Sequence, residues 1–181
     1  MGNMIETLAE RIAIQLKSIN PHETKSVPTM KFGLILIINM LLIITISLTI
    51  SLMIGTFQGT LLTLAGFLVL RQFSGGFHYS SSVYCTMTSI VGAVFIPLIT
   101  LPNDFVTPII IITLVLVALF APQDMEMQSR LFKQNQTLLL KIISITIVSS
   151  LFFIESETLV KTFFVQALTL IPLKGGGKDE K

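Results

Sequence analysis

The chain of 181 residues has one cysteine, two histidines and no tryptophan. A single cysteine excludes an intramolecular disulfide. Only 12% of the residues are charged and the net charge is +2, which is too small a basic excess to indicate a nucleic-acid partner. The first 30 residues lack the compact apolar core and cleavage site of a secretory signal peptide, so we expect no cleaved signal.

Apolar residues are abundant instead. They make up 52% of the chain, and the mean hydropathy is +0.83. This is too apolar for a soluble domain of this size and predicts an integral membrane protein in contact with a lipid bilayer. Several of the apolar segments are short for a bilayer core of about 30 Å. Some helices must therefore include neighbouring polar residues in order to span the bilayer, or else do not cross it. The predicted spans are 32–54, 55–70, 83–101, 105–120, 138–154 and 160–173.

Basic residues favour one topology. Four Lys or Arg residues precede the first span, and most of the others fall in alternate loops or the C-terminal tail. The positive-inside rule then predicts an all-α membrane protein with about six transmembrane helices and both termini cytoplasmic. Residues 1–173 would form one domain, with the helical bundle over 32–173, and the glycine-rich tail 174–181 would be disordered. Six short helices can bury only a small core within one chain, so the protein is compatible with a homodimer.

Residues 1–20 are predicted to form an amphipathic helix that ends at Asn20-Pro21. This helix would either lie at the membrane interface, where it could hold an amphipathic peptide, or pack as a cover on the bundle. The pattern consists of apolar residues at steps of three and four with charged residues between them: Ile5, Leu8, Ile12, Leu16 and Ile19.

The polar stretch 71–85, RQFSGGFHYSSSVYC, interrupts the apolar segments and contains the only cysteine, Cys85, and one of the two histidines, His78. A thiol is a nucleophile as the thiolate, and a nearby imidazole can take its proton and return it to a leaving amine. Cys85 and His78 are therefore the candidate catalytic residues. The alternative is that Cys85 is a small buried hydrophobe and His78 a satisfied polar residue.

The spacing of the two residues constrains the backbone. An unbroken helix would separate His78 and Cys85 by about 10 Å along its axis, whereas proton transfer needs about 3 Å. We therefore predict non-helical backbone around His78, which Gly75 and Gly76 permit, with a serine among 80–82 as the N-cap of a new helix. Cys85 would lie in the first turn of that helix, where the helix dipole favours a thiolate.

Arg71, Gly76, His78 and Cys85 together resemble the pattern of the accessory gene regulator B family. These are bacterial membrane cysteine peptidases that process a quorum-sensing propeptide. The segment 121–124, Ala-Pro-Gln-Asp, is similar to the Ala-Pro segment of that family. The end of the last apolar segment, 167–172, is also similar to the family's C-terminal end.

The resemblance implies an endopeptidase of the plasma membrane with its site at the cytoplasmic side. Cys85 would form an acyl-enzyme thioester while His78 moves the proton, and a thiol or hydroxyl of the propeptide would then close a thiolactone or lactone ring. This chemistry needs no cofactor or metal. A different hypothesis is a small peptide transporter or export factor without covalent chemistry, but the spans contain almost no ionisable residue that could line a pathway. A third is a membrane-assembly subunit in which Cys85 only packs.

Other residues have candidate supporting roles. The backbone N–H groups of Gly75 and Gly76, or the side chain of Gln72, could donate to an oxyanion. Arg71 would bind a substrate carboxylate or anchor its helix end by snorkelling. Asp124 would orient His78, bind substrate, or be a solvated loop carboxylate.

Overall fold

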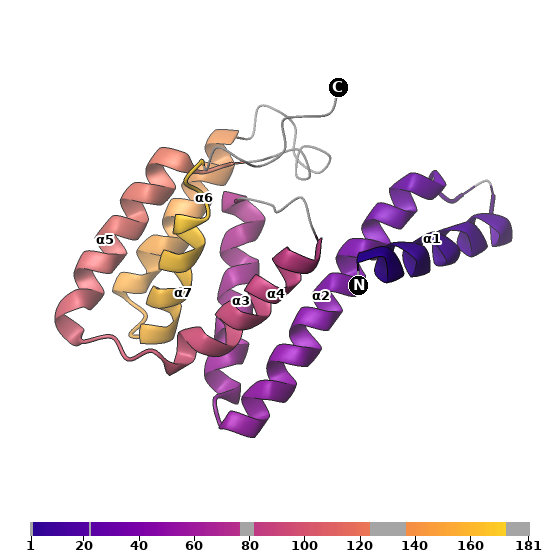
Figure 1. Cartoon of the computed structure of the whole chain (residues 1–181). Coiled ribbons are helices and arrows are strands. Elements are labelled where there is room, and N and C mark those ends of the chain that lie inside the picture. The colour runs from indigo at the N-terminus through magenta and orange to yellow at the C-terminus, as the bar shows by residue number, and fades with distance from the viewer. Residues whose placement is uncertain (1, 22, 77–81, 124–136, 173–181) are drawn as a thin grey trace.

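The computed structural model describes residues 2–21, 23–76, 82–123 and 137–172. Over these residues the chain is helical, with seven α-helices, two short 3-10 helices and no β-strand (Figure 1). The elements in chain order are α1 (Gly2–Ile19), α2 (Val27–Ile54), α3 (Phe57–Ser74), α4 (Ser82–Phe95), η1 (Ile96–Leu98), α5 (Asn103–Phe120), α6 (Thr137–Ser149), η3 (Ser150–Phe152) and α7 (Glu157–Leu168).

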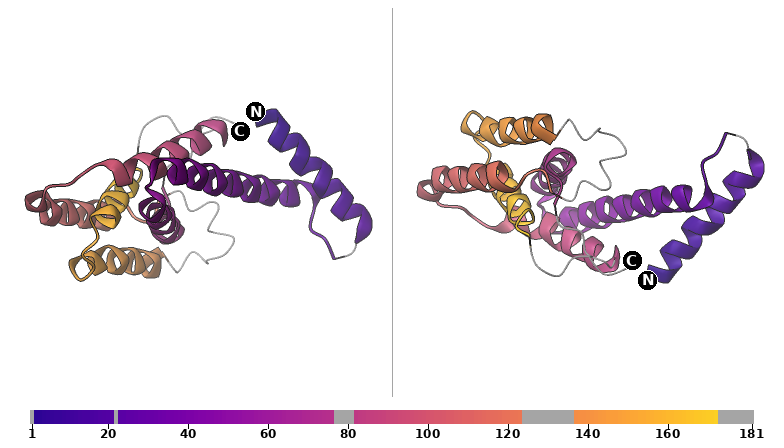
Figure 2. Two further views of the ribbon diagram at one scale, coloured as in Figure 1. Left: turned by 90° about the horizontal axis from the view of Figure 1, so that it is seen from below. Right: turned by 90° about the horizontal axis from the view of Figure 1, so that it is seen from above.

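Four helices share the buried apolar core. Helix α7 packs against α3 and α5, and α6 packs against the same two helices. Beside this group, α2 and α4 contact each other, and α1 lies along the N-terminal part of α2, away from the core (Figures 1 and 2). The core residues are Leu70, Ile110, Val117, Ala121, Val148, Leu151, Val160, Phe163, Ala167 and Leu170.

Small polar side chains are buried, while many large apolar side chains face outwards. The buried hydroxyls of Thr113 and Ser144 donate to carbonyl oxygens one turn earlier in their own helices, at 2.7 and 2.9 Å. By contrast, Leu41 at the middle of α2 is 58% exposed. Exposed large apolar side chains and buried small hydroxyls beside the apolar core are compatible with helices that pack in lipid.

Two helices are long and apolar enough to cross a membrane, by length and composition, within the described part of the chain. They are α2, with 28 residues, and α5, with 18. The combined α4–η1 and α6–η3 segments are shorter apolar helices. The prediction of helices at these positions is therefore confirmed, while the six-span topology and the cytoplasmic termini stay predictions.

Several helix bounds differ from the predicted spans; α2, for example, begins at Val27 and not at residue 32. Helix α3 continues to Ser74 instead of ending at residue 70, so Arg71 lies in its last turn and not in a loop. Helix α7 begins at Glu157 instead of residue 160, because Ser156 caps it by accepting a hydrogen bond from the Leu159 N–H, and it ends at Leu168 instead of residue 173. The end of α3 and the start of α7 are thus set by local caps, which hydropathy does not report.

Helix α1 ends at Ile19, as Asn20-Pro21 predicts, and it packs through alanines at the edge of the predicted apolar face. Its buried residues are Ala9 and Ala13, and α2 is the helix against which it packs. The predicted apolar face stays largely open, with Leu16 at 42% and Ile19 at 79% exposed. Alanine allows two helices to approach closely, which leaves the larger apolar residues for another partner.

Candidate active site

Two consecutive glycines follow the last residue of α3. Gly75 has a φ of 70° and Gly76 a φ of 139°, a region that residues with a side chain rarely adopt. The Gly75 N–H donates to the carbonyl oxygen of Arg71 at 3.0 Å, which closes the last turn of α3. We call these two residues the Gly75–Gly76 turn.

The Ala-Pro-Gln segment after α5 pairs with this turn. Gly75 and Gln123 form an isolated parallel β-bridge. The Gln123 N–H donates to the Ser74 oxygen at 3.0 Å, and the Gly76 N–H donates to the Gln123 oxygen at 3.3 Å. A Cβ on Gly75 would lie 1.9 Å from the Gln123 oxygen, so this pairing requires glycine. The structure thus joins two of the passages that carry the family resemblance.

Helix α7 supplies a buried side chain that the sequence analysis missed. Gln166 is fully buried, and its Nε2 donates to the Gly75 carbonyl oxygen at 2.8 Å. A Cβ on Gly76 would meet Thr169 Oγ1 at 2.8 Å, Gln166 Nε2 at 3.2 Å and a guanidinium nitrogen of Arg71 at 3.6 Å. The signal in the sequence that could have indicated this residue is the side-chain amide of Gln166 within the apolar segment 160–173.

Cys85 is the fourth residue of α4, which places it at the end of the first turn, as predicted. Its side chain is a free thiol of intermediate exposure. Arg71, in the last turn of α3, interacts electrostatically with Cys85. Arg71 and Cys85 therefore lie on two helices that contact each other.

The other predicted site residues have different positions. His78 and Asp124 lie outside the described residues, so their catalytic and orienting roles stay predictions. Gln72 is exposed on α3. The N–H groups of Gly75 and Gly76 already donate to carbonyl oxygens of the chain, so either group would have to give up its present bond to bind an oxyanion.

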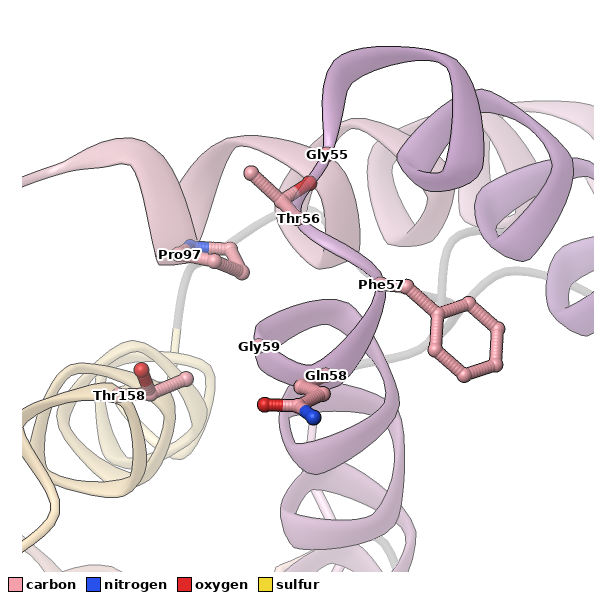
Figure 3. A pocket seen from close by; sticks show the side chains of 7 residues that line it. All are labelled: Gly55, Thr56, Phe57, Gln58, Gly59, Pro97 and Thr158. Atoms are coloured by element: carbon pink, nitrogen blue, oxygen red, sulfur yellow. The ribbon is translucent and has the colours of Figure 1, made fainter.

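An open hollow of about 520 Å³ surrounds the turn between α2 and α3, at the opposite end of α3 from Arg71 (Figure 3). Pro97, which lines the hollow, follows Cys85 by twelve residues, which is about 18 Å along a helix. The hollow is lined by Gly55, Thr56, Phe57, Gln58, Gly59, Pro97 and Thr158. We therefore assign it no part in reactions at Cys85.

Comparison with known proteins shows the family of this chain. The family model described as Accessory gene regulator B matches residues 5–173. An AgrB-like protein of Halalkalibacterium halodurans is 30% identical over 56% of this chain and 52% of the relative. Accessory gene regulator protein B of Staphylococcus aureus is 23% identical over 94% of this chain and 96% of the relative. An AgrB-like protein of Lactiplantibacillus plantarum is 25% identical over 98% and 94%, respectively. No solved structure matches.

Proposed function

Because the chain belongs to the accessory gene regulator B family, we propose that it is a membrane cysteine endopeptidase that processes a quorum-sensing propeptide. The observation that carries the proposal is the position of Cys85, a thiol of intermediate exposure at the end of the first turn of α4, the helix that contacts α3 and its Arg71. Reactive cysteines are partly exposed and often lie at helix N-termini. A cysteine that only packs needs neither feature.

The reaction has two steps. In the first, the Cys85 sulfur attacks the scissile carbonyl carbon, the C–N bond breaks, and His78 passes the thiol proton to the leaving amine. The product is an acyl-enzyme thioester. In the second, a thiol or hydroxyl within the bound propeptide attacks the thioester, which releases a thiolactone or lactone and returns the Cys85 thiol. The ring-closing nucleophile competes with water, so a site of low water content favours cyclisation.

A location in the bacterial plasma membrane is part of the same proposal. Two helices long and apolar enough to cross a bilayer support it, as do the buried hydroxyls and exposed apolar residues. Six spans with both termini cytoplasmic would place Cys85 at the reducing, cytoplasmic side, where the thiol stays free. The exposed apolar residues of α1 would then lie in the interface or against the amphipathic part of the propeptide.

The test is co-expression with a candidate propeptide, followed by measurement of cleavage. Cys85→Ala and His78→Ala should each abolish cleavage while the protein stays in the membrane fraction. Ser144→Ala is a matched control, because it also removes one heavy atom but acts on α6, where the hydroxyl donates only within its own helix. A peptide exporter would keep its export activity in Cys85→Ala. If the Cys85→Ala variant still cleaves the propeptide, Cys85 is not the nucleophile and the proposed cysteine peptidase is excluded.

A further inference from the structure

We propose that Gln166 of α7 is a positioning residue for the reaction at Cys85. Its side-chain amide fixes the Gly75–Gly76 turn, and this turn fixes the place of Arg71 relative to the thiol. The inference rests on the proposed peptidase function, because it concerns the same site, but it assigns a part to a helix that holds none of the predicted catalytic groups.

The contact is direct and buried. Gln166 Nε2 donates to the Gly75 oxygen at 2.8 Å and lies 3.5 Å from Ser74 Oγ. The Gly75 oxygen also accepts a longer hydrogen bond, of 3.3 Å, from Ser74 Oγ, so the Gln166 amide is the nearer of its two donors. The amide of Gln166 therefore acts on the two residues at which α3 ends.

Packing alone does not account for a glutamine at this position. Gln166 is fully buried, and its Oε1 has no hydrogen-bond partner among the described residues. A leucine of similar volume would be buried without that cost in desolvation. A buried amide that leaves its own oxygen unpartnered is better explained by the specific bond that its nitrogen makes.

The Gly75–Gly76 turn transmits the effect of this bond. Gln123 holds the turn from one side and Gln166 from another, while a guanidinium nitrogen of Arg71 lies 3.6 Å from the Cβ position of Gly76. Arg71 lies on α3, which contacts α4, the helix of Cys85. A misplacement of about 1 Å in an active site can cost roughly 100-fold in rate. Loss of one support would therefore impair the site without unfolding the helices.

The test compares Gln166→Leu and Gln166→Met with Thr162→Val in the purified full-length protein. Both Gln166 variants remove the amide and keep the volume. Thr162 lies one turn earlier on α7, is equally buried, and makes a polar contact with Thr63 of α3 at 3.4 Å, away from the turn. The readouts are Tm, kcat and KM for propeptide cleavage, and the alkylation rate of Cys85, which is the only cysteine.

We expect both Gln166 variants to keep Tm within about 3 °C, because the lost bond and the removed unpartnered oxygen offset each other. Their kcat should fall about 10- to 100-fold with KM within about twofold, and alkylation at neutral pH should slow about fivefold. Thr162→Val should match the wild type in all three readouts.

Wild-type kcat and alkylation in both Gln166 variants would overturn the proposal. Equal losses in Thr162→Val would also overturn it, since they would reveal a general effect of helix packing. Unimpaired cleavage by Cys85→Ala would instead refute the peptidase function. In that case the alkylation rates still decide whether Gln166 sets the surroundings of the thiol.

Discussion

Replacement of Gly75 by alanine tests the pairing on which the site depends. The new Cβ would lie 1.9 Å from the Gln123 oxygen and 3.0 Å from the Gln123 carbonyl carbon, both of them backbone atoms that cannot rotate away. The φ of 70° with a ψ of −146° adds strain for any residue with a side chain. The Gln123 segment must therefore move away from α3.

The cost can be estimated from these contacts. Backbone strain at such a position costs about 1 to 3 kcal/mol, and the two hydrogen bonds between Gln123 and residues 74 and 76 contribute about 1 kcal/mol each. The sum is about 3 to 5 kcal/mol, concentrated at the junction of α3 with the end of α5. We expect cleavage of the propeptide to fall at least 100-fold and Tm to drop by about 6 to 20 °C.

Gly92→Ala is the matched control for this experiment. Gly92 lies on α4, the helix of Cys85, and a Cβ there meets nothing within 4 Å. An alanine in a helix interior is favoured over glycine by about 1 kcal/mol, so this variant should be as active and at least as stable as the wild type. Wild-type cleavage and Tm in Gly75→Ala would refute the described pairing of Gly75 with Gln123.

Two further predictions concern the start of α7. The buried ammonium of Lys161 donates to the Ile99 carbonyl oxygen and to Glu157 Oε1. Lys161→Met should therefore leave the Ile99 carbonyl without this donor and destabilise the protein by about 1 to 3 kcal/mol, measured as a lower Tm. Lys161→Arg should retain part of the stability. The hydrogen bond from Lys161 lowers the pKa of the Glu157 carboxyl, aided by the Leu101 N–H. A carboxyl with a lowered pKa stabilises the fold above its unfolded-state pKa, and this contribution is lost as the pH falls through the folded-state pKa. Glu157→Gln should thus lose less Tm than the wild type on acidification below about pH 4.5, by a small margin because Glu157 is largely exposed. An identical acid profile in the two proteins would contradict this assignment.

The sequence predicted the helices better than their ends. The apolar segment 32–54 and the start of a helix before Cys85 follow from hydropathy and from the serine cluster, both of which are local signals. The continuation of α3 beyond residue 70 was missed, because polar residues after an apolar run look the same in sequence whether they end a helix or form a loop. What ends α3 is the backbone conformation of Gly75, which depends on its pairing with Gln123.

The supports of the site could not be predicted for a related reason. A single β-bridge between residues 75 and 123 has no periodicity in the sequence, since each partner contributes one residue. Gln166 interrupts an apolar run, but the same pattern arises when a polar side chain points out of a helix. Only the packing of α7 against α3 shows that the amide points inwards, at the end of α3.

The distribution of polarity leads to a test of the proposed membrane location. Leu41 lies at the middle of α2 and is 58% exposed, so in a bilayer it would face lipid near the centre. A lysine there would cost about 2.5 to 3.5 kcal/mol during insertion, whereas the same change on a surface in water would cost almost nothing. Leu41→Lys should therefore reduce the fraction of protein that resists extraction from membranes at high pH.

Ile19→Lys provides the comparison, because Ile19 is 79% exposed but ends α1, outside the predicted spans. A lysine at the interface can keep its ammonium in water, so this variant should remain in the membrane fraction like the wild type. If α2 is instead the surface helix of a soluble protein, Leu41→Lys will raise the yield of soluble protein and both variants will behave alike. In that outcome the exposed leucines of α2 would be covered by another protein and not by lipid. The proposed location of Cys85 at the cytoplasmic side of the membrane would then have no support from α2.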